Sequence, residues 1–214
     1  MVKICYTAIF GDYEDLKPPT VHSEGWRFIC FTDQPLQSEV WEIVNIDIGG
    51  DNPQRRAREV KILPHKWLPS YDWCMWVDAS FQINTDLNQW WAKYWRAPFT
   101  CPSHPIRNCV YREIQSCIVN KRGDEAELER QAAAYRAQKV PHHNGIITSG
   151  VLMRDNSQSC RQLCEAWWVE LSKYSARDQV AFANVGRFHY YYTFKWDYSQ
   201  ARDLRYFKHY HKRH

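Results

Sequence analysis

The sequence lacks the glycine-rich motifs that most often bind phosphate groups. It contains neither GxGxxG nor GxxxxGK[ST], so neither a dinucleotide-binding fold of the usual type nor a P-loop is supported. No Ser or Cys stands in a nucleophile-elbow pattern. Internal repeats and low-complexity segments are also absent. These absences leave a globular α/β enzyme or binding protein without a familiar phosphate loop.

Long apolar runs are missing as well. No run approaches the roughly 20 residues of a membrane span, and Met1–Cys5 opens directly into a strand-like pattern rather than a signal peptide. The 8 cysteines are scattered without a CxxC pair. Cys160 and Cys164 share one face of an expected helix, where packing is commoner than zinc binding. We therefore expect a soluble, cytoplasmic protein with free thiols and no membrane partner.

Aromatic residues, by contrast, are abundant. They make up 15% of the chain, with 11 Trp and 13 Tyr, and such rings stack on sugars and on bases alike. The net charge of +4 is a mild basic bias, which fits a polyanionic ligand without demanding nucleic acid. A length of 214 residues predicts one domain over 1–214 with a substantial core.

Strand-like and helix-like segments alternate, which predicts a mostly parallel α/β sheet flanked by helices. The expected strands are 2–10, 26–32, 41–48, 73–77, 98–101, 146–154 and 187–194. The expected helices are 54–67 with a break near Leu63, 86–95, 108–120, 125–138, 160–173 and 180–184. Pro at the first helical position after Asn52 is a good helix start.

The stretch Tyr71–Ile83 (YDWCMWVDASFQI) reads as a buried central strand that ends on Asp78. Ligands of open α/β sheets sit beyond the carboxyl ends of the strands, so Asp78 is placed to meet a metal or a substrate group. A turn-capping role is the alternative. The sequence favours the ligand contact once the rest of the chain is considered.

Two further stretches are candidates for the site. Arg55, Arg58, Lys61 and His65 recur at helical spacing and form a basic stripe, which indicates an anionic partner or, alternatively, a solvated charged face. Gly150 interrupts an expected strand, as glycine does where a ligand approaches the backbone. Asp178 lies in the first turn of an expected helix, where a carboxylate is favoured with or without a catalytic role.

A carboxylate at a strand end, a basic helix and histidines near the C-terminus suit a nucleoside diphosphate. A divalent cation held by Asp and His, facing Arg and Lys, neutralises such a group. A nucleoside diphosphate is therefore the leaving group that fits best.

Several motifs resemble a family of glycosyltransferase-like proteins with the GT-A fold. They are YTAIFGDYEDLKPP at 6–19, FICFTD at 28–33, ARxxKxxPHKW at 57–67, YDWCMWVDAS at 71–80, HPIR at 104–107, SGVLMR at 149–154, SARDQVAF at 175–182 and YFKHYHK at 206–212. The resemblance spans nearly the whole chain in the same order. It implies a GT-A-like α/β fold and transfer of a sugar from a nucleotide-diphosphate donor, with UDP-sugars favoured.

The resemblance also implies roles for residues of this chain. Donor contacts are expected from Thr7, Ala8, Phe10, Asp33, Arg58, Lys61, Ser149, Gly150 and Lys212. Asp78 and Asp178 are the expected catalytic carboxylates. Asp78, His209 and His211 are the expected ligands of Mn²⁺ or Mg²⁺. The motif departs from the family at Ser80, where a second carboxylate is usual, and a neutral hydroxyl is a poor ligand for a hard cation. Either the cation is held by Asp78, one histidine and water, which we favour, or the site works without metal through Arg58, Lys61 and Lys212.

The expected acceptor is a hydroxyl of a glycan or of a hydroxymethylated DNA base, the latter as in phage-type DNA modification. A non-catalytic module that binds nucleotide sugars or carbohydrate is the alternative, and the single carboxylate of Asp78-Ala79-Ser80 is the feature that favours it. A phosphotransferase or nuclease would require more clustered carboxylates.

Overall fold

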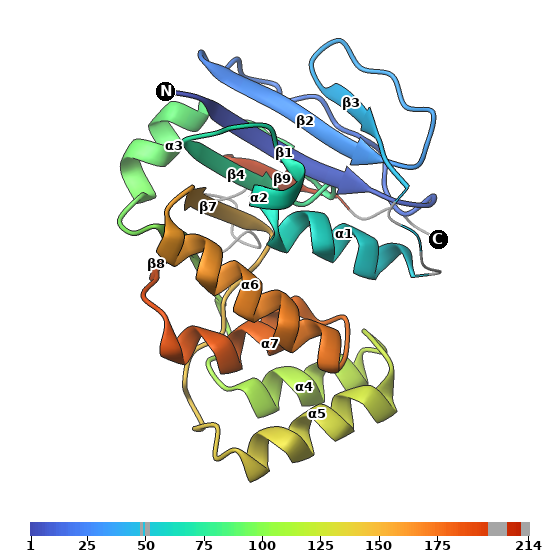
Figure 1. Cartoon of the computed structure of the whole chain (residues 1–214), viewed down its shortest axis with the longest axis vertical. Coiled ribbons are helices and arrows are strands. Elements are labelled where there is room, and N and C mark those ends of the chain that lie inside the picture. The colour runs from blue at the N-terminus through green and yellow to red at the C-terminus, as the bar shows by residue number, and fades with distance from the viewer. Residues whose placement is uncertain (48, 50–51, 197–204, 211–214) are drawn as a thin grey trace.

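The computed structural model describes the chain except residues 48, 50–51, 197–204 and 211–214 (Figure 1). A seven-stranded sheet has the order β3-β2-β1-β4-β7-β6-β8, and β5 and β9 form a separate pair. The strand bounds are β1 Lys3–Ile9, β2 Trp26–Thr32, β3 Glu42–Asn45, β4 Trp73–Val77, β5 Phe81–Ile83, β6 Phe99–Ser103, β7 Val151–Asp155, β8 Tyr192–Lys195 and β9 Phe207–His209.

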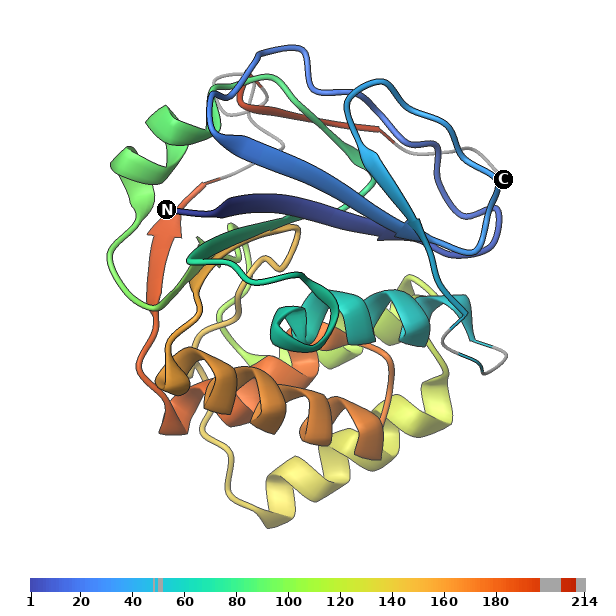
Figure 2. The same cartoon turned by 45° about the horizontal axis from the view of Figure 1, so that its top comes forward.

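Helices cover both faces of the large sheet. Their bounds are α1 Pro53–Ile62, α2 Pro64–Trp67, α3 Leu87–Tyr94, α4 Val110–Val119, α5 Glu125–Ala137, α6 Gln158–Lys173 and α7 Asp178–Val185, with a 3₁₀ turn at Gly186–Phe188. Figures 1 and 2 show α1, α6 and α7 together on one side of the sheet, with α4 and α5 farthest from it. The other face is covered by α3 and the β5–β9 pair, whose apolar side chains share one core cluster with that face.

The alternation of side chains along each strand explains why both faces are covered. In β1, Ile4 and Tyr6 enter the core beneath α1 and α6, whereas Cys5 enters the core beneath α3. In β4, Trp76 and Met75 divide in the same way. Strands that are apolar on both faces are typical of a sheet covered on both sides.

Strand directions confirm the prediction of a mixed, mostly parallel sheet. β1 runs parallel to β2 and β4, β2 to β3, and β6 to β8. β7 is antiparallel to both of its neighbours, β4 and β6. The carboxyl ends of β1, β2, β3 and β4 therefore meet at one edge, and the loops that follow them lie together there.

Three of the predicted strands differ from the structure. The strand expected at 146–154 begins only at Val151, since Ile147 makes an isolated bridge with Ser103 and residues 149–150 form a turn before β7. The strand expected at 187–194 is a 3₁₀ turn followed by the shorter β8. Gly186, which starts the turn, packs against the rings of Phe182 and Tyr191. The strand expected at 41–48 is reduced to the four residues of β3.

The helix expected at 54–67 is divided as predicted. Asn52 caps α1 by accepting a hydrogen bond from the Arg55 N–H, and Pro53 occupies the first helical position. Leu63 leaves helical geometry, with φ −110° and ψ 57°, because the helix cannot continue through Pro64. A separate turn, α2, follows. The break leaves the last turn of α1 at the site described below.

Candidate active site

The candidate site lies at the carboxyl end of β4. Asp78 follows this strand directly, and its N–H donates to the Gly150 carbonyl at 2.9 Å. That bond joins the end of β4 to the turn before β7. The first residue of α7, Asp178, reaches the same place, because the Ser149 hydroxyl donates to its Oδ2 at 2.9 Å. Asp78 and Asp178, which lie 100 positions apart in sequence, are thus brought together.

Lys61 joins the two carboxylates. Its side chain is fully buried, and Nζ lies 3.1 Å from Asp78 Oδ1 and 2.7 Å from Asp178 Oδ2. Trp76 Nε1 also donates to Asp78 Oδ1, at 2.6 Å. The floor of the site is therefore a fixed arrangement of one ammonium and two carboxylates.

Asp178 is held as a carboxylate by several groups. Burial alone would raise its pKa, but the charges of Arg58, Lys61 and Arg177 and the hydrogen bond from Lys61 outweigh burial and hold the pKa of Asp178 well below its usual range. Arg58 Nε lies 3.3 Å from Asp178 Oδ2. The Gln179 N–H donates to Oδ1 at 2.9 Å. A carboxylate with this many donors is a weak base.

A cleft of about 580 Å³ opens above this floor. Its walls come from the loop after β1, from α1, from the segment after β4, from the turn between α4 and α5, and from the start of α7. The lining residues include Ala8, Tyr13, Glu14, Gln54, Arg58, Asp78, Ser80, Lys121, Arg122, Ser149, Gly150, Arg177, Asp178, Gln179 and His209. Its size is that of a small-molecule site.

Most of the predicted site residues meet in this cleft. Ala8, Arg58, Asp78, Ser149, Gly150, Asp178 and His209 line it, and Lys61 lies beneath it in contact with both acids. His209 reaches the cleft because β9 pairs with β5, which places it opposite Phe81. The two remaining predicted residues near the C-terminus, His211 and Lys212, lie outside the described residues.

The other predicted donor contacts lie beside the cleft rather than in its lining. Phe10 lines an adjoining hollow with Tyr13 and Gln54. Asp33 lies 2.9 Å from Arg56 and accepts the Gly11 N–H, so it anchors the loop after β1. The Thr7 hydroxyl is buried and has no hydrogen-bond partner among the described residues.

Gly150 has a structural requirement that the sequence did not indicate. A Cβ atom at this position would lie 2.6 Å from a ring carbon of Phe81. The glycine therefore lets the Phe81 ring pack against the backbone next to Asp78. The prediction attributed this glycine to the close approach of a ligand within a strand; the approaching group is a side chain of the protein, and the glycine precedes the strand.

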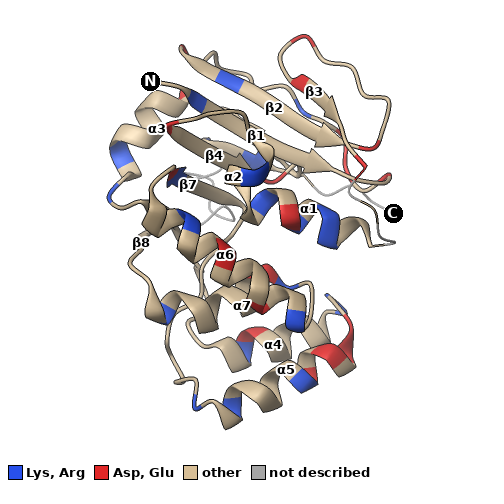
Figure 3. Cartoon of the chain, viewed as in Figure 1, with Lys and Arg blue, Asp and Glu red and all other residues tan. Residues whose placement is uncertain are grey.

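The basic stripe of α1 is not a solvated face. Arg58 and Lys61 face Asp178, and Arg55 donates to two backbone carbonyls at the C-terminal end of α6. His65, which the structure places in α2, has its Nε2 2.8 Å from Glu165. The partners found in the structure are thus carboxylates and neutral carbonyl oxygens of the chain itself. Figure 3 shows the basic residues of α1 beside the helices that supply these groups.

Several cleft residues were missed by sequence reasoning. Tyr13, Glu14, Gln54, Lys121, Arg122, Arg177 and Gln179 line the cleft. Arg177 and Gln179 flank Asp178 in the SARDQVAF motif, which could have indicated them. Lys121 and Arg122 lie in a turn that carries no such signal.

Of the predicted metal ligands, Asp78 and His209 line the described cleft, where Glu14 and Asp178 are the other acidic side chains. Both side-chain hydrogen bonds of Asp78 fall on Oδ1, and its Oδ2 faces the glycine backbone, 3.4 Å from the position of a Cβ on Gly150. His209 lines the same cleft. No group of three or more His, Cys, Asp or Glu residues suited to a metal occurs in the part of the chain that the structure describes. One carboxylate and one imidazole fit a cation that keeps water and substrate phosphate as its other ligands.

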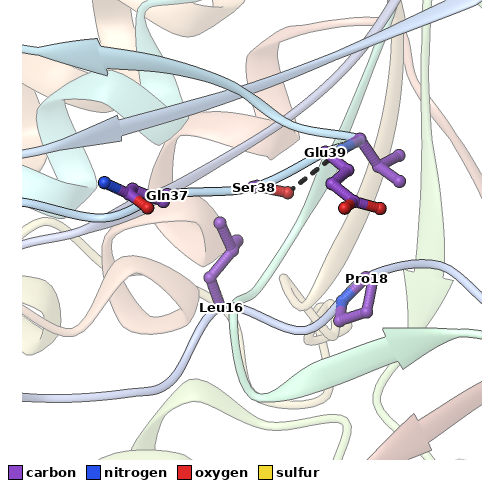
Figure 4. Close-up of a pocket in the computed structure, with 6 residues that line it drawn as sticks. Leu16, Pro18, Gln37, Ser38 and Glu39 are labelled. Carbon is purple, nitrogen blue, oxygen red and sulfur yellow. Dashed lines mark hydrogen bonds between the residues drawn. The ribbon is translucent and has the colours of Figure 1, made fainter.

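A second hollow lies apart from these residues. It is formed by Leu16, Pro18, Gln37, Ser38, Glu39 and Val40, between the loops that follow β1 and β2 (Figure 4). None of the predicted site residues lines it. Its one charged side chain is Glu39, so it offers no positive charge to a diphosphate.

The fold and the cleft define an α/β protein whose ligand site lies at the carboxyl ends of sheet strands. In sequence, residues 31–196 match the family described as TOD1/MUCI70, glycosyltransferase-like domain, and the chain belongs to this family. It is also 21% identical over 209 residues to a probable hexosyltransferase, MUCI70, of Arabidopsis thaliana. The match covers 84% of this chain but 36% of that relative.

All eight cysteines are free and buried. Among the helices of the described residues, none is both long and apolar enough to pass through a lipid bilayer.

Proposed function

We propose that the chain transfers a hexosyl group from a nucleotide-diphosphate sugar, with a UDP-sugar as the favoured donor, to an acceptor hydroxyl, using a GT-A-like site. In this reaction the acceptor oxygen forms a bond to the anomeric carbon. The bond from that carbon to the diphosphate breaks, the diphosphate leaves with the electron pair, and the hydroxyl proton is released. The observation that carries the proposal is the Asp78–Lys61–Asp178 cluster in the cleft at the end of β4.

The charge balance of the cluster supports a metal requirement. Lys61 and Arg58 face Asp78 and Asp178, so their charges largely cancel. A bound cation would add positive charge beside a departing diphosphate. Asp78 and His209 would hold Mn²⁺ or Mg²⁺, which supplies that charge when bound. His211 and Lys212 remain predicted contacts of the same group.

We assign Asp178 a positioning role in this reaction rather than that of a general base. A base must accept a proton near the working pH, and the pKa of Asp178 is held well below its usual range by Arg58, Lys61 and Arg177 despite burial. The carboxylate instead fixes Lys61 and Arg58 at the cleft. Ser149 and Gly150 would then line the sugar side of the donor, and Ala8, with Thr7, Phe10 and Asp33 around it, the nucleoside side.

The deciding experiment is an assay of donor turnover across a panel of nucleotide sugars with Mn²⁺. We expect release of nucleoside diphosphate that EDTA abolishes and that Asp78→Asn reduces by about 10²-fold or more. Binding of the donor nucleotide, measured by calorimetry, should require the cation. Turnover that persists in EDTA would refute the metal, and absence of turnover with every donor would refute the transferase.

The alternative is a module that binds a nucleotide sugar without turning it over. Ser80, in place of a second carboxylate, is the feature that favours it. Donor affinity without product formation, in the presence of candidate acceptors, would establish this alternative. A glycan hydroxyl and a hydroxymethylated DNA base are the two acceptors that the sequence predicts, and the cleft itself bears on that choice.

A further inference from the structure

The turn between α4 and α5 delivers two cations to the cleft. Lys121 and Arg122 are exposed and line it. The turn is closed by hydrogen bonds from the Arg122 N–H to the Cys117 carbonyl at 2.8 Å and from the Lys121 N–H to the Ile118 carbonyl at 3.0 Å. Lys121 adopts φ 52°, a conformation that non-glycine residues rarely take. The turn therefore has one defined shape, which holds both side chains at the mouth of the cleft.

Arg177 adds a third cation to the same wall. A Cβ atom on Gly123 would lie 3.6 Å from Arg177 Cγ, so the turn packs along the arginine stem. Arg177 lines the cleft with Lys121 and Arg122. We call these three residues the basic lip. It belongs to α4, α5 and α7, whereas the predicted nucleoside contacts belong to the loop after β1.

Two charges of the basic lip, those of Lys121 and Arg122, are not balanced as those of the floor are, whereas the charge of Arg177 acts on Asp178. Arg58 and Lys61 form ion pairs with Asp178. In the described part of the chain, no ion pair to a carboxylate involves Lys121, Arg122 or Arg177. Arg177 Nε is buried and has no hydrogen-bond partner among the described residues. A bound anion would give the exposed Lys121 and Arg122 side chains a charged partner.

The acidic residues around the basic lip limit which class of anion can bind there. Asp124, Glu125, Glu127 and Glu129 follow the lip directly at the start of α5, where Figure 3 shows acidic segments. A nucleic acid needs an extended positive surface along its phosphates, and these acids would repel it. A saccharide carboxylate needs only a local cluster of cations rather than an extended positive surface.

We propose that the basic lip binds the carboxylate of an acidic saccharide, which is the acceptor of the transfer. The role of this saccharide as the acceptor rests on the proposed function, but its binding at the basic lip does not depend on turnover. The lip holds the acidic sugar by charge-assisted hydrogen bonds. The acceptor hydroxyl is thereby held in the same cleft as the donor.

The test compares two ligands and two double variants. The ligands are an oligosaccharide of hexuronic acid and the same chain with its carboxyl groups reduced to neutral hydroxymethyl groups. The test variant is Lys121→Ala with Arg122→Ala. The control is Lys139→Ala with Arg130→Ala, because Lys139 has the matching φ of 54° and both of these residues are exposed on α5 and its end, outside the cleft lining.

We expect the wild type and the control to bind the acidic oligosaccharide about 10- to 100-fold more tightly than its neutral form. The test variant should lose this preference while its affinity for UDP with Mn²⁺ stays unchanged. Equal binding of the two oligosaccharides by the wild type would overturn the proposal. Tighter binding of duplex DNA that the test variant loses would overturn it in favour of nucleic acid. Failure of UDP to bind the wild type would count against the proposed transferase and not against the lip.

Discussion

Lys61 is the residue on which both acids of the cleft converge. Its side chain is fully buried, and its partners Asp78 and Asp178 differ in exposure at 29% and 2%. A buried ion pair contributes little net stability against an apolar replacement of both partners, but loss of one partner leaves an uncompensated charge. Lys61 therefore couples the stability of the fold to the geometry of the site.

Replacement of this lysine tests that coupling. Lys61→Met leaves Asp178 buried with Arg58 as its remaining close cation, so we expect a loss of about 3–5 kcal/mol in the free energy of unfolding. Lys66→Met is the control, because Lys66 is 49% exposed and its contact with Glu165 is 3.4 Å; such surface pairs contribute about 0–1 kcal/mol. Urea unfolding measures both. Equal effects of the two substitutions would contradict the assignment.

Asp178 gives a prediction for pH. Because its pKa is lowered in the folded state, the carboxylate stabilises the fold above the unfolded pKa of about 3.9, and that contribution is lost as pH falls further. Asp178→Asn should therefore lower the free energy of unfolding most near pH 7. The difference in unfolding free energy between wild type and variant should shrink between about pH 4 and pH 2. A difference independent of pH would be inconsistent with an ionised Asp178.

The same variant distinguishes positioning from base catalysis. If Asp178 positions Lys61 and Arg58, Asp178→Asn lowers donor affinity together with the rate, and the pH profile of kcat keeps its wild-type shape. If Asp178 were a general base, the variant would lose one limb of the pH profile of kcat, and its donor affinity would stay nearly intact. Steady-state kinetics from pH 5 to 9, with calorimetry of donor binding, separates the two roles.

Single residues were predictable where local pattern decides their position. Asp78 was placed at the end of a buried strand because apolar runs and turn signals are local. The pairing of Lys61 with Asp178 was not, since it depends on how α7 packs against α1. The single sign of the stripe predicted an anionic partner, and Arg58 and Lys61 meet Asp178 of the chain itself. A sequence does not say whether such a partner belongs to the chain or to a ligand.

At the scale of elements, the broken end of α1 is held by a buried polar group. Arg154 Nη1 and the Tyr6 hydroxyl both donate to the Lys61 carbonyl, at 2.8 Å and 2.9 Å. Arg154 also donates to the Tyr6 hydroxyl. Tyr6 lies in β1 and Arg154 in β7. The two strands thus fix the backbone of Lys61, whose ammonium group lies beneath the cleft. The break at Pro64 exposes the carbonyl that they satisfy.

Tyr6→Phe tests this support with a minimal change. The substitution keeps the ring but removes the hydroxyl between Arg154 and the Lys61 carbonyl, so we expect a loss of about 1–3 kcal/mol in unfolding free energy. Because Lys61 is then less firmly placed, donor-nucleotide affinity should fall as well. Tyr190→Phe, on a tyrosine that is 74% exposed, is the control. Unchanged stability of Tyr6→Phe would exclude the support.

The β5–β9 pair places His209. Phe207 is fully buried against Phe81 and Trp90, so Phe207→Ala should cost about 3–5 kcal/mol of stability. His209→Ala should cost far less stability but raise the Mn²⁺ concentration needed for donor binding. Thermal unfolding and Mn²⁺ titration give the two readings. An unaltered Mn²⁺ requirement in His209→Ala would remove His209 from the metal site.

This pair shows why some elements escape prediction. β9 has three residues, and its strand identity comes from pairing with β5 across more than 120 positions. By contrast, α6 and α5 have caps and lengths that local sequence determines, with Ser157 and Asp124 at their starts. Short strands fixed by distant partners carry little local signal.

At the scale of the molecule, the order of strands was not predictable, although the alternation of strands and helices was. Periodicity indicates which face of a strand is buried but not which strand lies beside it. The antiparallel β7 between β4 and β6 illustrates this, since nothing in its sequence reports its direction. Yet this insertion brings the turn at Ser149 next to Asp78 and so completes the cleft.

The whole chain spans about a third of its curated relative, at 36%, yet the cleft is built from residues within it. We therefore expect the 214-residue chain to bind the donor nucleotide unaided. A ligand at 100 times its Kd stabilises the folded state by about 2.7 kcal/mol. UDP with Mn²⁺ should thus raise Tm by several degrees, whereas uridine, which lacks the diphosphate, should not. EDTA should abolish the shift, and Lys61→Met should reduce it. An equal shift with uridine would show that nucleoside contacts alone account for binding, and would refute the role assigned to the charged floor of the cleft.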